Sequence, residues 1–485
     1  MKSIQPHVRE TIMNVPMAAT AMAAAWSFML PELGPAQVAT PDFKLAGDWQ
    51  GTLYVQGTEL PLVFHFLESE DGTMSGSLDS PAQGATGLPI SEVAIRGDTL
   101  VVEVSSVGGQ YQALRDGDRF TGKWRQGATT LPLDLIRVPA GESAFVFVRP
   151  QHPTEPYPYQ SREVEFDNVA AGIRLAGTLT LPATGRGLPG VILISGSGPQ
   201  DRDETVFGHR PFLVLADHLT RSGIAVLRFD DRGVGRSSGD FSAATTEDFA
   251  SDVEAALDYL AGRPEVNAAA IGLIGHSEGG LVAPMVAAES ERVAFVVLLA
   301  GPGTPGDRIL INQAELIARA SGLSEEAAQS VRIRQKEILE AVTRGTEQTE
   351  LEALLRKHMQ DQLAGLTDEE KDARIQTQLA ALSSPWFRYF LAYDPVPALR
   401  KVRVPVLALT GELDLQVPYE ENLSQIEEAL VSGGNPDVTV VSLAGHNHLL
   451  QEAKTGLPAE YAQIEQTISP TALDLVSSWI LERVH

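Results

Sequence analysis

A serine lies between two glycines where an apolar run meets a segment with helical spacing. The stretch AIGLIGHSEGGLVAPM, residues 270–285, contains the pattern Gly275-x-Ser277-x-Gly279. Glycines on both sides of a serine permit the sharp strand-to-helix turn that exposes a nucleophilic hydroxyl. The same pattern also arises by chance in glycine-rich turns, so it predicts a nucleophile only where an acid and a histidine follow in that order.

A serine hydroxyl needs a histidine that accepts its proton, and the histidine needs a carboxylate that orients it. Both kinds of residue follow Ser277, the carboxylates after one apolar run and the histidines after the next. The order serine, acid, histidine predicts acyl transfer through a covalent intermediate. The candidates are Glu412 and Asp414 in TGELDLQVP, and His446 and His448 in LAGHNHLLQ.

Acyl transfer also needs N–H donors for the oxygen that becomes negatively charged. The backbone N–H of Glu278, at the start of the helix expected after Ser277, is the first candidate for this oxyanion hole. The loop SGSGPQDRD, residues 195–203, consists largely of small residues that let the main chain approach a substrate. We expect the second donor to be the N–H of Ser197, and the N–H of Gly198 is the second choice. Alternatively, this loop is only a tight turn that binds no ligand.

Continuous apolar runs position these residues. Strands that do not alternate polar and apolar residues are buried on both faces, which is typical of a parallel sheet covered by helices. Segments 212–223, 245–263 and 470–484 have apolar residues at helical spacing. We therefore predict a doubly wound α/β domain over residues 161–485. The runs are GVILISG (190–196), GIAVLRFD (223–230), AIGLIGHS (270–277), AFVVLLAG (294–301), VPVLALTG (404–411) and VTVVSLAG (438–445).

The preceding part of the chain has a different period. Residues 42–150 alternate between polar and apolar in short runs such as DTLVVEVSS, separated by turn signals, which predicts an antiparallel β-sandwich or barrel domain. The proline-rich stretch RPQHPTEPYPYQ removes amide donors and favours extended backbone, so residues 151–160 are expected to form a linker.

One connection in the α/β domain is much longer than an ordinary crossover. About 100 residues, mostly helix-forming and charged, separate two of the apolar runs, and long inserts in compact domains tend to be functional. We expect a helical cap at about 303–395 that covers the serine; a solvated helical hairpin is the alternative. The aromatic residues from Trp386 to Tyr393 form either the core of this cap or the wall of an acyl pocket.

The first 41 residues resemble a targeting segment. Lys2 and Arg9 precede the apolar run 13–30, and small residues suited to cleavage lie inside it. Residues 1–41 are therefore expected to be a signal peptide, with an N-terminal arm as the alternative. A signal peptide places the protein in the periplasm or outside the cell; the alternative location is cytoplasmic. No other segment reaches about 18 consecutive apolar residues, so no integral membrane span is expected.

Composition narrows the possible partners. The chain has 485 residues with 63 acidic and 37 basic side chains, a net charge of -26 spread along its length, which argues against nucleic acid and anionic membranes. The absence of cysteine excludes disulfides and thiolate nucleophiles. Neither metal nor cofactor is expected: His446 and His448 lack a carboxylate-bearing helix motif, and the glycines at 233–239 are one residue too widely spaced for a dinucleotide fingerprint.

Taken together, these motifs resemble those of a bacterial α/β-hydrolase of the serine esterase kind. In the family pattern the carboxylate three residues after the glycine matches Asp414, and the histidine after an asparagine matches His448. The resemblance implies a triad of Ser277, Asp414 and His448 that cleaves small carboxylic esters, behind a β-rich N-terminal domain. It rests on GHSEGG (275–280), SGSGPQDRD (195–203), DDRGVGRSSG (230–239), TGELDLQVP (410–418), NHLLQ (447–451) and, for the β-rich domain, LAGDWQGTL (45–53).

The resemblance leaves other functions open. One departure concerns SGSGP, where relatives often have a histidine before the glycines, which bears on the second oxyanion donor. An aminopeptidase-like or lactone-opening hydrolase would have the same triad. A ligand-binding protein with an inert hydrolase domain is an alternative from another class, against which the intact order of serine, acid and histidine argues. The fold alone specifies neither the natural ester nor the oligomeric state.

Overall fold

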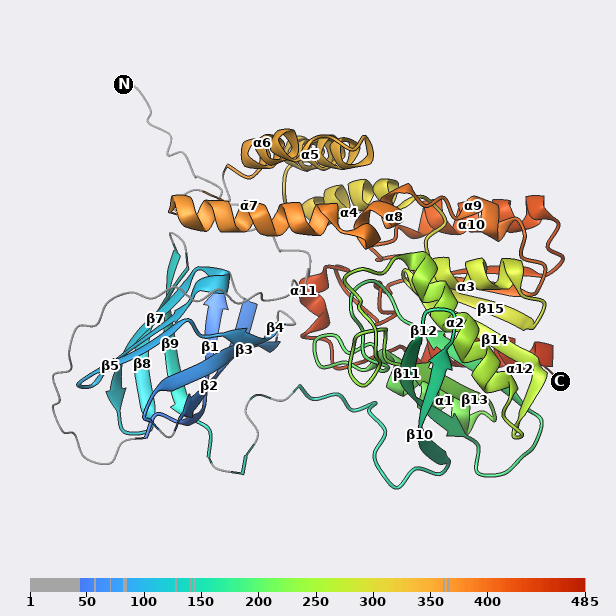
Figure 1. The fold of residues 1–485 in the computed structure, drawn as a ribbon, viewed down its shortest axis with the longest axis horizontal. Coiled ribbons are helices and arrows are strands. Elements are labelled where there is room, and N and C mark those ends of the chain that lie inside the picture. Colours follow the sequence, from blue (N-terminus) through green and yellow to red (C-terminus); the bar gives the residue numbers. More distant parts are fainter. Residues whose placement is uncertain are drawn as a thin grey trace.

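The protein contains two β-sheets, each with its own hydrophobic core (Figure 1). The expected signal peptide or arm at 1–41 lies outside the residues that the structure describes. The computed structural model describes residues 44–484 except 56–57, 70, 82–84, 127–128, 140, 143–144, 146, 361–362 and 364–366.

The first sheet is antiparallel throughout, in the strand order β4-β3-β2-β1-β9-β8-β7-β6-β5. Alternate residues face its core, where Trp49, Phe64 and Tyr111 are buried. This confirms the predicted antiparallel all-β unit. Its strands are β1 (Gly47–Val55), β2 (Thr58–Glu68), β3 (Met74–Ser80), β4 (Ala85–Pro89), β5 (Glu92–Arg96), β6 (Thr99–Val104), β7 (Gly109–Asp116), β8 (Arg119–Gln126) and β9 (Thr129–Arg137), with a short 3-10 helix, η2 (Ser105–Val107), after β6.

The second sheet has the order β10-β11-β13-β12-β14-β15-β16-β17. The strands from β13 to β17 in this order run parallel, and β10 and β11 form an antiparallel hairpin at one edge. The parallel strands therefore end along a common edge. The strands are β10 (Gln160–Asn168), β11 (Ile173–Leu181), β12 (Leu188–Ile194), β13 (Ala225–Phe229), β14 (Val266–His276), β15 (Val293–Leu299), β16 (Val406–Gly411) and β17 (Val438–Leu443).

Helices cover both faces of the second sheet. One core cluster joins the sheet to α2 (Thr246–Ala261), α3 (Gly279–Glu289) and α10 (Tyr419–Gly433), with the short α9 (Val396–Leu399) beside them. The other joins it to α1 (Pro211–Arg221) and α12 (Pro470–Val484); a short helix, α11 (Pro458–Tyr461), precedes α12. The doubly wound α/β prediction is thus confirmed. Within the described part of the chain, no helix is both long and apolar enough to cross a membrane.

The helical insert expected between two strands is present between β15 and β16 (Figure 1). Its core includes Leu281 of α3, so the insert packs on a helix that covers the sheet. Its helices are α4 (Gly306–Ala320), α5 (Glu325–Thr343), α6 (Gln348–His358), α7 (Asp368–Ser383) and α8 (Pro385–Ala392).

The segment that joins the sheets is bound to loops of the second sheet. The Arg149 guanidinium donates to the carbonyl oxygens of Phe207 at 2.7 Å, Ala462 at 3.0 Å and Ile464 at 3.0 Å. Nε2 of Gln151 donates to the carbonyl oxygen of Ile468 at 2.7 Å. Arg149, at the end of the expected β domain, and Gln151, at the start of the expected linker, therefore bind this segment to those loops. The division of the chain into domains at 150 and 160 stays a prediction.

Candidate active site

Ser277 occupies the turn between β14 and α3. Its φ of 52° lies in the left-handed region, which is strained for a residue other than glycine. A Cβ at Gly275 would lie 2.0 Å from the carbonyl oxygen of Gly279, and one at Gly279 would lie 2.2 Å from that of Ile194. Both glycines of the sequence pattern are therefore required by close packing. The strained, tightly packed turn presents the serine at the carboxyl end of β14.

Asp414 and His448 form a buried pair beyond the ends of β16 and β17. Nδ1 of His448 lies 2.8 Å from Oδ2 of Asp414, and the two residues are 5% and 3% exposed. The other carboxylate oxygen, Oδ1, accepts the N–H groups of Gln416 and Val417, each at 2.8 Å. These bonds fix the carboxylate so that Oδ2 faces the imidazole. With its proton on Nδ1, His448 has Nε2 available as a base.

The two competing candidates have other partners. Glu412 is exposed, and its Oε1 accepts a hydrogen bond from Ser442 Oγ at 2.9 Å. His446 is buried between the carbonyl oxygen of Ala444 at 2.9 Å and Ser469 Oγ at 2.8 Å, so it joins its loop to the start of α12. The structure thus pairs Asp414 with His448, the combination that the family resemblance implies.

His276, directly before the serine, connects Ser277 to this pair. Its ring centroid lies 4.9 Å from that of His448, and its Nε2 lies 3.1 Å from the His448 carbonyl oxygen. The structure therefore brings Ser277, Asp414 and His448 to one edge of the sheet from β14, β16 and β17.

The two expected oxyanion residues also meet. Ser197 Oγ donates to Oε2 of Glu278 at 2.7 Å. A Cβ at Gly196 would lie 3.1 Å from the Cβ of Ser277, so the loop after β12 lies against the serine. Glu278 is the N-cap of α3, where the first N–H groups have no partner inside the helix. The roles of the Ser197 and Glu278 N–H groups stay predictions.

The side chain of Glu278 has a role that the sequence did not reveal. Its buried carboxylate also accepts from Thr246 Oγ1 at 2.7 Å and from Trp386 Nε1, which lies 2.8 and 2.9 Å from its two oxygens. Burial raises the pKa of Glu278, and the hydrogen bonds offset only part of this effect. Trp386 lies in α8, so the helical insert reaches the residue that follows the serine. Phe390 of the same helix is buried in the core of the insert.

Asp231 is a further carboxylate at this edge. It accepts from Ser195 Oγ at 2.7 Å and from the N–H of Gln200 at 2.9 Å. Burial, together with the nearby charges of Glu278 and Glu204, raises the pKa of Asp231 to about 8. In the sequence this residue belongs to a motif interpreted only as a turn. Its partners show that it holds both ends of the 195–200 segment.

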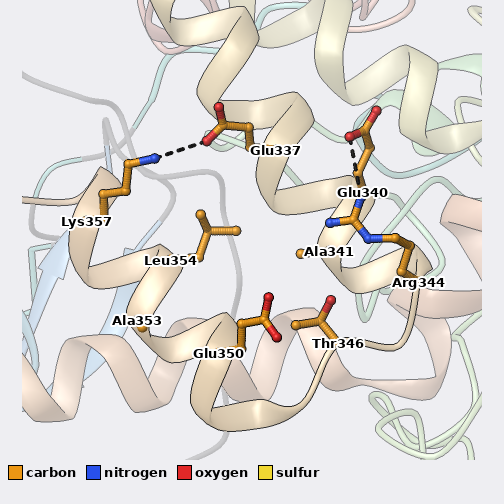
Figure 2. A pocket seen from close by; sticks show the side chains of 9 residues that line it. All are labelled: Glu337, Glu340, Ala341, Arg344, Thr346, Glu350, Ala353, Leu354 and Lys357. Atoms are coloured by element: carbon orange, nitrogen blue, oxygen red, sulfur yellow. Dashed lines mark hydrogen bonds and ion pairs between the residues drawn. The ribbon is translucent and has the colours of Figure 1, made fainter.

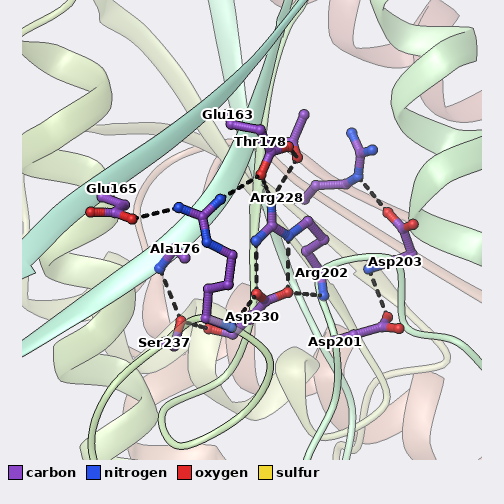
Figure 3. A network of polar contacts seen from close by, with 11 residues as sticks. Glu163, Glu165, Ala176, Thr178, Asp201, Arg202, Asp203, Arg228, Asp230 and Ser237 are labelled. Atoms are coloured by element: carbon purple, nitrogen blue, oxygen red, sulfur yellow. Dashed lines mark hydrogen bonds and ion pairs between the residues drawn. The ribbon is translucent and has the colours of Figure 1, made fainter.

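Ion pairs also hold this loop (Figure 3). Nε and Nη2 of Arg202 donate to the two oxygens of Asp230 at 2.9 and 2.7 Å, and its Nη1 donates to Glu163 at 2.7 Å. Asp203 accepts from Nε of Arg228 at 2.7 Å. Burial alone would raise the pKa of Asp230, but the bonds from Arg202 outweigh it and the pKa is lowered. The loop is therefore fixed in position by charged partners on β10 and β13 and in the turn after β13.

A separate hollow of 420 Å³ lies on the helical insert (Figure 2). It is lined by residues of α5, α6 and the turn between them, and an ion pair at 3.4 Å between Lys357 and Glu337 crosses one side. Charges of both signs surround it, and none of the candidate catalytic residues lines it. Among the described residues, no cluster of three or more histidine or acidic side chains is arranged to hold a metal ion.

The sequence of this chain is similar to those of known hydrolases. The sequence matches the alpha/beta hydrolase family over residues 191–463. It is 24% identical over 311 residues to Esterase EstD of Thermotoga maritima, covering 64% of this chain and 66% of that protein. The chain therefore spans just under two thirds of the length of this relative.

Solved structures similar to this chain include an alpha/beta hydrolase and an esterase. The alpha/beta hydrolase GrgF from Penicillium sp. sh18 is 18% identical, with 67% of this chain and 99% of that chain covered and a TM-score of 0.42. An esterase of Pyrococcus furiosus is 15% identical, with 71% and 100% covered and a TM-score of 0.42.

Proposed function

Because the chain belongs to the alpha/beta hydrolase family, we propose that it is a serine hydrolase that cleaves small carboxylic esters through an acyl-enzyme. One observation carries this proposal: the buried Asp414–His448 pair lies at the same sheet edge as Ser277 on its strained turn. The relative Esterase EstD supports the choice of an ester. No cofactor or metal takes part in the proposed reaction.

The reaction proceeds in two steps, formation of the acyl-enzyme and its hydrolysis. Ser277 Oγ attacks the ester carbonyl carbon while Nε2 of His448 takes the hydroxyl proton, and Asp414 stabilises the imidazolium through Nδ1. The N–H groups of Glu278 and Ser197 bind the oxyanion, which collapses and expels the alcohol as His448 returns the proton. A water molecule then attacks the acyl-enzyme by the same route, releasing the acid and restoring Ser277.

Glu278 and Asp231, two carboxylates near the serine, are already occupied, which favours an ester over an amino-terminal peptide. A peptidase that acts at an amino terminus needs a carboxylate free to bind the substrate ammonium group. Both oxygens of Glu278 and both of Asp231 accept hydrogen bonds from the protein itself. Oε2 of Glu204 has no hydrogen-bond partner among the described residues, but this side chain is buried. A lactone, as a cyclic ester, fits the same chemistry and is the second candidate substrate.

The location proposed for the protein is the periplasm or the outside of the cell. This proposal rests on the sequence of residues 1–41, with their basic start and apolar run.

The test is a substrate profile with matched variants. We expect nitrophenyl esters of graded acyl length to be hydrolysed and aminoacyl anilides to be hydrolysed far more slowly. Ser277→Ala lowers ester turnover by about 10⁵-fold, because the nucleophile is lost. Ser432→Ala, which changes an exposed serine at the end of α10, serves as the control and keeps full activity. Retention of a tenth of the activity by folded Ser277→Ala contradicts the assignment.

A further inference from the structure

A second carboxylate–imidazole pair lies behind the candidate triad. Oε1 of Glu204 and Nδ1 of His276 are 2.9 Å apart, and the residues are 4% and 8% exposed. Glu204 belongs to the loop after β12, whereas His276 ends β14 and directly precedes Ser277. Glu204 has a φ of 53°, a strained conformation for glutamate that persists only where surrounding contacts maintain it.

Each member of the pair also has a partner in a loop that carries a candidate catalytic group. Oε1 of Glu204 also accepts the N–H of Gly196 at 2.7 Å, and Gly196 precedes the expected oxyanion donor Ser197. Nε2 of His276 donates to the backbone carbonyl oxygen of His448 at 3.1 Å. A continuous chain of hydrogen bonds therefore runs from the oxyanion-side loop through the end of the serine strand to the loop of the histidine base.

The hydrogen bond to the His448 carbonyl oxygen requires a proton on Nε2 of His276, because a carbonyl oxygen can only accept. An ionised Glu204 requires a second proton on Nδ1. Burial alone would lower the pKa of His276, but the charge of Glu204 and its hydrogen bond outweigh burial, and the pKa is raised. Asp414, on the loop after β16, adds to this effect, and the His448 ring faces the pair from the loop after β17.

We propose that Glu204 and His276 are positioning residues. They hold the oxyanion-side loop and the loop of His448 in the positions relative to Ser277 that the reaction needs. This inference rests on the proposed function. Neither residue touches the reacting atoms in the proposed reaction. A buried ion pair is a weak source of stability because of its desolvation cost, so we assign this pair a role in the geometry of the loops and not in stability. A displacement of a catalytic group by about 1 Å can lower the rate 10²-fold.

The pair also determines the charge next to the base. At the position of His448, the negative charge of an ionised Glu204 and the positive charge of a doubly protonated His276 nearly cancel. Replacement of His276 by a neutral amide leaves the negative charge of Glu204 uncompensated, which favours the protonated form of a neighbouring imidazole. The acid limb of the kcat/KM profile then moves to higher pH, an effect that a purely structural role does not produce.

Three variants of the full chain test the proposal. His276→Gln places an amide N–H near the position of Nε2 and retains a donor for the His448 carbonyl oxygen, whereas His276→Asn reaches only toward Glu204. Glu204→Gln keeps an acceptor for Gly196 N–H but removes the charge. Ester kinetics are measured as kcat and KM over pH 5 to 9, with folding followed by circular dichroism.

We expect all three variants to lower kcat, with KM within about threefold of the parent because substrate binding is not their task. His276→Asn loses about 10²-fold and His276→Gln less, because only the glutamine keeps the hydrogen bond to the loop of the base His448. Both histidine variants move the acid limb upward by about one pH unit. Unchanged kcat and unchanged limbs in folded variants overturn the proposal, and so does loss of the fold in all three, which would show a folding role alone.

The parent and Ser277→Ala are measured in the same experiment. Absence of ester turnover in the parent, or its persistence in Ser277→Ala, refutes the proposed function. Normal turnover in the parent with unaffected pair variants refutes the positioning role alone.

Discussion

The two sheets of this protein treat charge in opposite ways. Among the described residues of β1 to β9, Ser80 is the only polar side chain that is buried, and the rest of the core is apolar or aromatic. The second sheet buries several ionisable side chains, and those near the ends of its parallel strands include Glu204, His276, Glu278, Asp414 and His448.

Burial of charge costs free energy unless partners compensate it, so it is not a general means of stabilising a fold. Each of these five side chains has a hydrogen-bond partner in another segment of the chain, as Glu278 has in Ser197 and in Trp386 of α8. The apolar core of the antiparallel sheet therefore serves stability. We infer that the buried charges at this edge of the second sheet serve to fix the positions of its loops.

The largest effect is expected from variants of the buried pair Asp414 and His448. Asp414→Asn and His448→Ala should each lower turnover by about 10³-fold or more, because a wrongly oriented or absent base leaves the serine a poor nucleophile. Their neighbours provide matched controls. Glu412→Gln and His446→Ala should cost about tenfold or less, because their bonds lead to Ser442 and Ser469. The reverse ranking, on protein shown to be folded, would contradict the assignment of either pair.

A smaller effect concerns the contact between the insert and the serine turn. Trp386→Phe keeps an aromatic ring but removes the N–H that Glu278 accepts, leaving a buried carboxylate with fewer donors. We expect kcat/KM to fall about tenfold, with an altered preference for acyl length. Tyr389→Phe removes a polar atom from the same helix and should change neither quantity. Identical acyl-length profiles for the parent and Trp386→Phe would exclude a pocket role for Trp386.

The next prediction tests how far the two sheets are independent. A chain that begins at residue 147 keeps Arg149 and its three bonds to backbone carbonyl oxygens, whereas one that begins at residue 161 lacks them. Both should retain ester turnover, because the antiparallel sheet supplies no catalytic group. The shorter chain should unfold about 5 °C lower, since hydrogen bonds to a charged group are stabilising. Loss of turnover in a folded chain beginning at 147 would show that the first sheet completes the site.

The smallest effect concerns the partly buried histidine of the antiparallel sheet. Nδ1 of His65 lies 2.7 Å from Asp48 and Nε2 lies 3.1 Å from Asp79. Burial alone would lower the pKa of His65, but the two carboxylates outweigh burial and raise it above 6.5. The stability from this contact is therefore fully present below pH 6.5 and is lost as the pH rises through the raised value.

Thermal unfolding at pH 5.5 and 8 measures this contribution. Because His65 is partly exposed, we expect a difference of only about 1 to 2 °C between the parent and His65→Gln at the lower pH, and none at the higher. A larger difference in unfolding temperature at pH 8 than at pH 5.5 would contradict a raised pKa of His65 in the folded protein.

Local patterns allowed part of the site to be predicted from the sequence. Gly275, Ser277 and Gly279 lie within one turn, and their spacing reflects backbone packing that any such elbow requires. Because parallel strands end at a common edge, the apolar runs narrowed the acid to Glu412 or Asp414 and the base to His446 or His448. The resemblance to the hydrolase family then selected Asp414 and His448.

The remaining contacts join residues that no local pattern relates. His276 and Glu204 are 72 positions apart, and Trp386 and Glu278 are 108 positions apart. The sequence places Glu278 for its backbone N–H alone and gives no sign that its side chain joins the insert to the oxyanion-side loop. Partners of buried charges depend on how loops fold over the strand ends, which periodicity does not report.

Covalent labelling tests most directly whether Ser277 is the nucleophile of an acyl-enzyme. A fluorophosphonate probe is incubated with the parent and with Ser277→Ala, followed by intact mass measurement and peptide mapping. We expect one adduct per chain, on the peptide that contains Ser277, and none on the variant. An adduct on another residue, or equal labelling of Ser277→Ala, would contradict this role of Ser277.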